Sequence, residues 1–138
     1  MGKRKGVKIT DKLVNYFKLR IRYWAERNGL HSWRINFCHT DTEDYVSCVT
    51  TDYPNRAAWI EITQNPNAIN PDSVINEDYM DRTALHECYE ILFSPLRDKL
   101  QEIYNPELVS EWIHTLIVTL VTERLGHEQS RSMQRRKM

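Results

Sequence analysis

The order of the hydrophobic patterns along the chain is the feature that most constrains its fold. Apolar residues recur at helical spacing before residue 29, alternate with polar residues between 32 and 63, and return to helical spacing from about residue 79. One helix should therefore precede a small group of strands, and further helices should follow it. The length of 138 residues suits one domain with a modest core. We expect an α+β fold.

The first element predicted is a long N-terminal helix. Thr10 or Asp11 can cap its start, it runs to about Asn28, and Gly29 ends it. We expect a packing helix with a polar outer side. Its broad apolar face consists of Leu13, Tyr16, Phe17, Leu19, Ile21 and Trp24.

Three β-rich segments follow, at residues 33–38, 45–51 and 57–63. Polar turns of a few residues separate them, and short connections favour a meander. We therefore expect a small antiparallel three-stranded sheet. The loop at residues 64–73 contains two Asn-Pro pairs and either closes over a site or only connects.

The remaining chain is predicted to be helical. A helix of about Tyr79–Phe93 should end or kink at Ser94-Pro95, and a short helix at 96–104 should follow. The last helix should begin at Asn105-Pro106 and end at Leu125, before Gly126. Because the segment between them is short, we expect the 79–93 helix to pack antiparallel to the last helix.

The two ends of the chain are basic although the formal net charge is zero. We expect flexible segments at residues 1–8 and 127–138 on either side of a single domain, 9–126. Solvated, frayed ends are one interpretation of these charges, and a weak nucleic-acid contact is the other. The zero net charge itself gives no general attraction to nucleic acid or to membranes.

The cysteines and the apolar runs bear on location. Three cysteines without a secretory signal indicate reduced thiols and an intracellular, cytoplasmic setting. We expect Cys88 to be packed and inert. The longest apolar run, at about 113–121, is half the length that spans a bilayer, so no membrane association is expected.

The 79–93 helix contains the motif His-Glu-x-x-Glu, formed by His86, Glu87 and Glu90. Residues four apart lie on one helix face, so His86 and Glu90 can converge with Glu87 beside them. An imidazole, a carboxylate and a free neighbouring carboxylate are the parts of hydrolytic zinc sites. The usual motif ends in His where this chain has Glu90.

A catalytic metal needs a third protein ligand, and the last helix offers Glu111 and His114. With His114 the set has two imidazoles and one carboxylate. With Glu111 it has two carboxylates, which shifts the preference from Zn²⁺ towards Mn²⁺, Fe²⁺ or Co²⁺. Glu111-x-x-His114 also has the spacing of di-iron bundles, but that class needs a second such motif.

The chemistry expected of this set is hydrolysis. One Zn²⁺ ion, or Mn²⁺ or Fe²⁺ in its place, would lower the pKa of a bound water, and Glu87 would take the proton. If the strand at 57–63 edges the cleft, an extended peptide or protein substrate could pair with it.

A structural interpretation of the same residues stands beside this one. His86 can be a hydrogen-bonded, half-buried histidine. Glu87 and Glu90 can belong to a solvated face that pairs with Arg82 or Arg97. Glu111 suits the start of a helix electrostatically, and His114 can be a core histidine.

The order of elements around this motif resembles a minimal zincin. A strand starting at Trp33, a last strand at 57–63, the His86-Glu87 helix with Pro95 and a following helix are similar in layout to SprT-like and minigluzincin metallopeptidases of phage origin. The resemblance covers about residues 9–125. It implies a metal ligand at His86, a general base at Glu87, a second ligand at Glu90 and an acidic third ligand best matched by Glu111.

Two functions follow from the resemblance. One is a metal-dependent peptidase that acts in the cytoplasm, in the host cell if the chain is phage-encoded. The alternative is a catalytically inactive zincin-like accessory or structural protein that binds protein or nucleic acid. The sequence carries no signal for the substrate or the oligomeric state.

Overall fold

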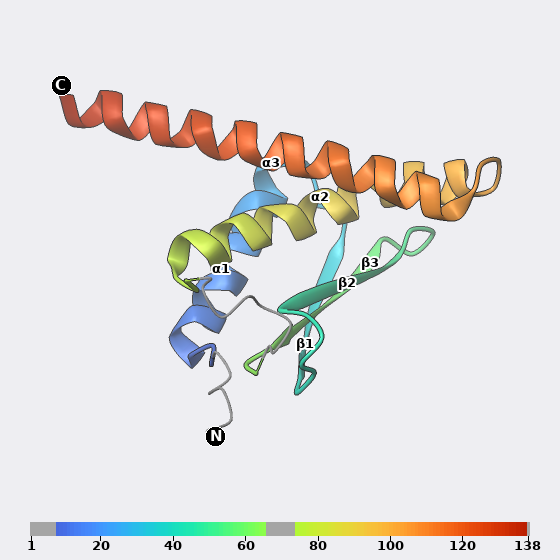
Figure 1. Cartoon of the computed structure of the whole chain (residues 1–138), viewed down its shortest axis with the longest axis horizontal. Coiled ribbons are helices and arrows are strands. Elements are labelled where there is room, and N and C mark those ends of the chain that lie inside the picture. The colour runs from blue at the N-terminus through green and yellow to red at the C-terminus, as the bar shows by residue number, and fades with distance from the viewer. Residues whose placement is uncertain (1–7, 66–73, 138) are drawn as a thin grey trace, which may run out of the picture. The chain divides into compact units, whose positions relative to one another are not determined.

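The structure is a computed structural model that describes residues 8–65 and 74–137 (Figure 1). The predicted flexible segment 1–8 and the predicted loop 64–73 lie almost entirely outside these residues. Internal contacts divide the chain into two compact units, residues 1–92 and residues 93–138. The first unit contains α1, the sheet and most of α2, and the second contains the end of α2 and all of α3.

The N-terminal helix, α1, spans Asp11–Arg27 and confirms the prediction at both ends. Thr10 caps it, its side-chain oxygen accepting a hydrogen bond from the Leu13 amide at 3.3 Å. Gly29 ends it with a φ of +72°, a conformation that favours glycine. Leu19, expected on the apolar face, is 60% exposed. The fully buried residues of α1 are Phe17, Ile21 and Trp24.

Three strands form the sheet: β1 (Arg34–Thr40), β2 (Ser47–Asp52) and β3 (Ala57–Thr63). Their positions agree with the prediction, but their arrangement does not. The strand order is β1-β3-β2, with β1 parallel and β2 antiparallel to β3. The expectation of an antiparallel meander was therefore wrong, and the sheet is mixed.

The hydrophobic content of β3 explains this order. Five of its seven residues are buried, whereas the residues of β1 and β2 are exposed or half-buried. The most apolar strand takes the central position, where neighbours cover both of its edges. The prediction that β3 could edge a cleft and pair with a peptide was consequently wrong, because β1 and β2 are the edge strands.

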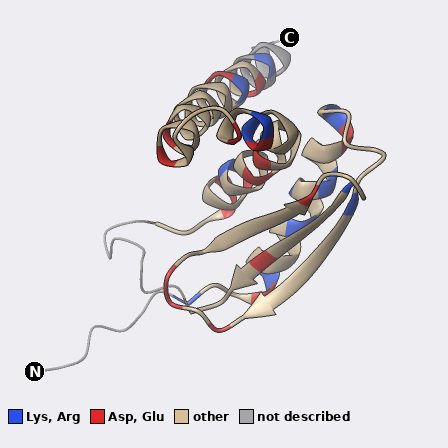
Figure 2. Ribbon diagram, turned by 90° about the vertical axis from the view of Figure 1, so that its right-hand side faces the viewer, with Lys and Arg blue, Asp and Glu red and all other residues tan. Residues whose placement is uncertain are grey.

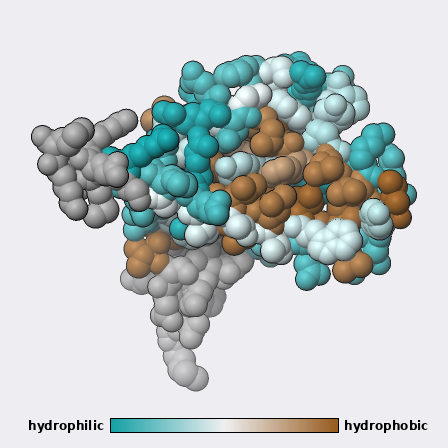
Figure 3. Space-filling model, turned by 90° about the horizontal axis from the view of Figure 1, so that it is seen from above, coloured by the Kyte–Doolittle hydropathy of each residue, from teal (hydrophilic) through white to brown (hydrophobic). Residues whose placement is uncertain are grey.

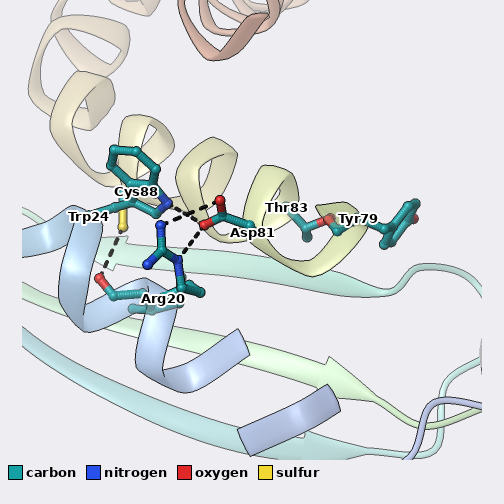
Figure 4. A network of polar contacts seen from close by, with 7 residues as sticks. Arg20, Trp24, Tyr79, Asp81, Thr83 and Cys88 are labelled. Atoms are coloured by element: carbon teal, nitrogen blue, oxygen red, sulfur yellow. Dashed lines mark hydrogen bonds and ion pairs between the residues drawn. The ribbon is translucent and has the colours of Figure 1, made fainter. Parts of the chain in front are cut away.

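Helix α2 spans Glu77–Gln101 and passes through Pro95 without interruption. The separate helix predicted at 96–104 is thus wrong. The fully buried Ile91 and Ser94 anchor the helix just before the proline, and tertiary packing of this kind overrides local propensity. Within the first unit, α1 and α2 lie on the same side of the sheet (Figures 1 and 4). The fully buried residues that α2 contributes there are Met80, Ala84, Leu85, Cys88 and Ile91.

A polar network joins α1 to α2 inside the first unit (Figure 4). Asp81 accepts a hydrogen bond from the Arg20 Nε at 2.6 Å and another from the Trp24 Nε1 at 2.7 Å. About two turns further along α2, the Cys88 thiol donates to the Ile21 carbonyl at 3.5 Å. These contacts fix the rotation of α2 about its axis, and hence the direction of the side chains that follow Asp81.

The second unit is a helical hairpin made by the end of α2 and by α3 (Pro106–Lys137). Asn105 caps α3, its Oδ1 accepting from the Glu107 amide at 2.9 Å. The Gln101 side chain donates to the Ser110 hydroxyl at 3.1 Å and ties the two helices together. On one face of α3 the buried residues are Val109, Ile113, Ile117 and Val121.

The last helix does not end where the sequence predicts. Gly126 lies inside α3, which continues to Lys137. Unlike Gly29, Gly126 is not among the described residues with positive φ, so it adopts ordinary helical backbone. A glycine inside a helix costs only about 1 kcal/mol, which the flanking turns can absorb. Within the described ranges, no helix is both long and apolar enough to cross a bilayer.

The Asp81 network yields a first prediction. Replacing Asp81 with alanine leaves the fully buried Trp24 indole without its acceptor, and we expect Asp81→Ala to lower the free energy of unfolding by about 2–3 kcal/mol. Asp98→Ala is the control on the same helix, because Asp98 is 54% exposed and its contact with Arg97 is 3.8 Å long. Urea denaturation should show a change below about 0.5 kcal/mol for the control. Equal effects of the two substitutions would contradict the role of Asp81.

Candidate metal centre

Helix α2 brings the side chains of His86 and Glu90 together, as their spacing predicts. The His86 Nε2 lies 3.4 Å from the Glu90 Oε1, and the two side chains are 24% and 18% exposed. Both groups are therefore half-buried but reachable from solvent. The predicted convergence of these two donors is confirmed within the first unit.

The separation of the two donor atoms fits a shared cation. At 3.4 Å it is longer than the usual hydrogen bond between a nitrogen and a carboxylate oxygen. A tetrahedral metal with bonds of roughly 2.0–2.1 Å holds two of its ligand atoms about 3.3 Å apart. His86 and Glu90 are thus spaced as one edge of such a coordination sphere, without any change of rotamer.

The electrostatics around His86 favour positive charge. The hydrogen bond to Glu90 raises the pKa of His86 most, burial lowers it, and the charge of Glu87 raises it further. The net direction is upward. An environment that stabilises a proton between two carboxylates and an imidazole also stabilises a divalent cation, which competes with that proton for the same ligand atoms.

Glu87 is the most unusual group of the site. It is 6% exposed, and its Oε2 atom has no hydrogen-bond partner among the described residues. Burial is the main cause that raises its pKa, to about 7; the Glu90 charge adds to the increase, whereas His86 and the nearby Ser47 hydroxyl oppose it. The interpretation of Glu87 as part of a solvated helix face was therefore wrong. A buried carboxyl oxygen without a partner is costly and points to a function.

Cys88 shares the helix but not the site. It is fully buried, its thiol contacts the Ile21 carbonyl, and burial raises its pKa to about 12. The thiolate, which is the form that binds metals and attacks electrophiles, is thus disfavoured. The prediction of a packed and inert cysteine is confirmed as to packing.

The edge strand β2 contributes residues that the sequence did not single out. Ser47 approaches Glu87, and burial followed by the charges of Glu87, Glu61 and Glu90 raises the pKa of Cys48. Ser47 occupies an inward position of its strand, in the same alternation as the half-buried Val49. A polar residue at an inward strand position was the one signal that could have identified it.

A further polar pair lies beside this edge. The Tyr45 hydroxyl donates a hydrogen bond to the Glu61 carboxylate, which raises the pKa of Tyr45 to about 12. Glu61 is half-buried on β3, directly across from Cys48 in the register of the sheet. Carboxylates therefore surround the start of β2 from both the sheet and α2.

The candidate third ligands lie on α3, in the second unit. Glu111 and His114 are both exposed and are one helical turn apart, as their spacing predicts. The interpretation of His114 as a core histidine was consequently wrong.

Comparison of the chain with protein-family models, with curated proteins and with solved structures gives no match. The likeness to zincins therefore stays a prediction that depends on the layout of the elements and on the motif.

The burial of Glu87 predicts a specific pH dependence of stability. Its pKa is about 7 in the folded chain against 4.5 for an ordinary glutamate, so the folded state binds more protons between these values. The metal-free protein should lose stability as pH rises from about 4.5 to about 7, by on the order of 3 kcal/mol from this group. Glu87→Gln removes the ionisation and should be the more stable form at pH 8.

Urea denaturation of chelator-treated protein at pH 4.5 and pH 8 tests this. The advantage of Glu87→Gln should be present at pH 8 and largely absent at pH 4.5. Glu26→Gln, at an exposed position of α1, is the matched control and should show no such difference. The same stability difference at both pH values would show that Glu87 does not titrate in this way.

Proposed function

We propose that the chain is a metal-dependent hydrolase of peptide bonds, of the zincin type, in which His86 and Glu90 hold one metal ion and Glu87 is the general base. The observation that carries the proposal is the buried Glu87 carboxyl, one oxygen of which has no partner among the described residues, on the same helix as two donor atoms 3.4 Å apart. A residue with a purely structural role gains nothing from burying such a group without a partner.

For the third ligand we propose His114. His86, Glu90 and His114 then form a set of donors that could hold one metal ion. Two imidazoles and one carboxylate are the ligands of many hydrolytic zinc sites, with a fourth position left for water or substrate. Glu111 would give a more anionic set that favours Mn²⁺ or Fe²⁺ over Zn²⁺.

The remaining residues of the site have roles that suit hydrolysis. When bound, a divalent cation supplies Lewis acidity that polarises a carbonyl group and acidifies water. Glu87 would take a proton from the attacking water and later deliver it to the leaving amine. Its pKa of about 7 suits both steps near neutral pH. Ser47, near the same carboxyl, would hold it in position.

A peptide is the substrate class that the sheet favours. Strand β2 is an edge strand, and it carries Ser47 next to Glu87. Its outer edge offers backbone groups to which an extended peptide can add as a further strand. This edge replaces β3, the strand to which the sequence had assigned that role.

Two substitutions should distinguish the residues that bind the metal from the residue that acts as the base in hydrolysis. His86→Ala removes a ligand and should weaken metal binding at least about 100-fold, as measured by calorimetric titration of chelator-treated protein with Zn²⁺ or Mn²⁺. Glu87→Gln keeps the ligands, so its affinity should stay within a few-fold of the parent. Cleavage of a fluorogenic peptide library should nevertheless fall about 100-fold or more in Glu87→Gln. If Glu87→Gln loses the metal, or retains full cleavage, Glu87 is not the base.

Alanine substitutions on α3 should identify the third ligand. With His114 in this role, His114→Ala should lower Zn²⁺ affinity at least about tenfold, while Glu111→Ala, one turn away and equally exposed, should leave it unchanged. The reverse result in the same titration would assign the third ligand to Glu111. No effect of either substitution would place it elsewhere.

A further inference from the structure

One face of α3 changes its chemical character along the helix. Among the side chains that the structure describes on this helix, the last buried one is Val121. The positions that continue the same face by helical geometry are Arg124, Glu128 and Arg131, with His127 beside them. The apolar face of the first half thus becomes a charged face in the second half. In Figure 2, blue segments mark Lys and Arg towards the C-terminal end of this helix.

This second half of α3 is strongly basic. Residues 124–138 contain five arginines and lysines but only one acidic residue, Glu128. Within the second unit, the α2 segment from residue 93 to Gln101 is about 13 Å long, whereas α3 is about 48 Å long. The basic half therefore extends well beyond the helix that accompanies it in that unit.

Two of the arginines in this half of α3 line a common cavity. A cavity of about 250 Å³ is lined by Arg124, His127, Glu128 and Arg131. Two arginines, one histidine and one glutamate thus line the same cavity. The fork of a guanidinium matches two oxygens of a phosphate, and the cavity has room for such a group.

We propose that this face, formed by Arg124, His127 and Arg131, binds the phosphodiester backbone of nucleic acid without sequence preference. Guanidinium contacts to successive phosphates supply this kind of affinity through the release of counterions. The carboxylate of Glu128 reduces the net positive charge of the cavity but does not cancel the two guanidinium charges that line it.

An anionic membrane is the competing partner, and the apolar residues of α3 argue against it. A helix that lies on a membrane needs an apolar face along its basic residues. The exposed large apolar residues that the structure describes on α3 all precede the basic half: Leu108, Trp112, Leu116 and Val118. Figure 3 shows apolar side chains, in brown, gathered away from the C-terminal end of the helix. The basic half itself has only Leu125, Met133 and Met138 as large apolar residues.

Fluorescence anisotropy of the full-length chain with labelled single- and double-stranded oligonucleotides, between about 50 and 200 mM salt, tests the proposal. Binding should weaken steeply with salt. The double substitution Arg124→Gln/Arg131→Gln should make the slope of the logarithm of the binding constant against the logarithm of the salt concentration shallower by about 2. It should also weaken binding roughly tenfold at the lowest salt. Arg124→Lys/Arg131→Lys should retain most of the slope, because it retains the charges.

Lys12→Gln/Arg22→Gln is the matched control, because it removes the same charge from exposed positions of α1. The control should bind as the parent chain does, and circular dichroism should show unchanged helix content for every variant. Absent or salt-independent binding, an equal loss in the control, or tighter binding to phosphatidylserine vesicles would each overturn the proposal. Performing the assay in chelator keeps its outcome independent of the proposed hydrolase function.

Discussion

Burial of the Glu87 carboxyl group is the constraint on which the candidate site depends. Removing this group from water raises its pKa to about 7, and one of its oxygens has no hydrogen-bond partner in the part of the chain that the structure describes. The fold tolerates the unfavourable free energy of burying this carboxyl because other contacts of the first unit hold α2 in place. Asp81 accepts hydrogen bonds from Arg20 and Trp24 of α1. Cys88, the residue after Glu87, is fully buried. A helix fixed in this way has a set rotation, so Glu87 stays buried while His86 and Glu90 remain half-exposed.

Much of the fold could be predicted from periodicity and from caps. Thr10 and Gly29 bound the first helix as expected, and all three strands lie where alternation placed them. Strand order was not predicted, because short connections alone favour a meander, whereas the central position is taken by β3, the strand with the most buried residues. The predicted ends of the last two helices were wrong for a related reason. Pro95 and Gly126 are weak local signals that packing and the neighbouring helical turns override.

The site was partly predictable because its core is local. Four-residue spacing on one helix is enough to bring His86 and Glu90 together, and the structure confirms it. Whether Glu87 is buried depends on tertiary packing, and the same motif would fit a solvated surface equally well. Ser47 was not predicted because it reaches the site from a strand forty residues away in the sequence. Contacts of that kind have no periodic signature.

The central claim is that His86 and Glu90 hold a metal ion beside a buried base, and metal content tests it most directly. The protein should be purified without a metal-affinity tag, incubated with Zn²⁺, Mn²⁺ or Fe²⁺, freed of unbound ions by gel filtration and assayed by elemental analysis. The account predicts about one equivalent of a divalent cation per chain. A metal-free protein after incubation with each of the three ions would contradict it.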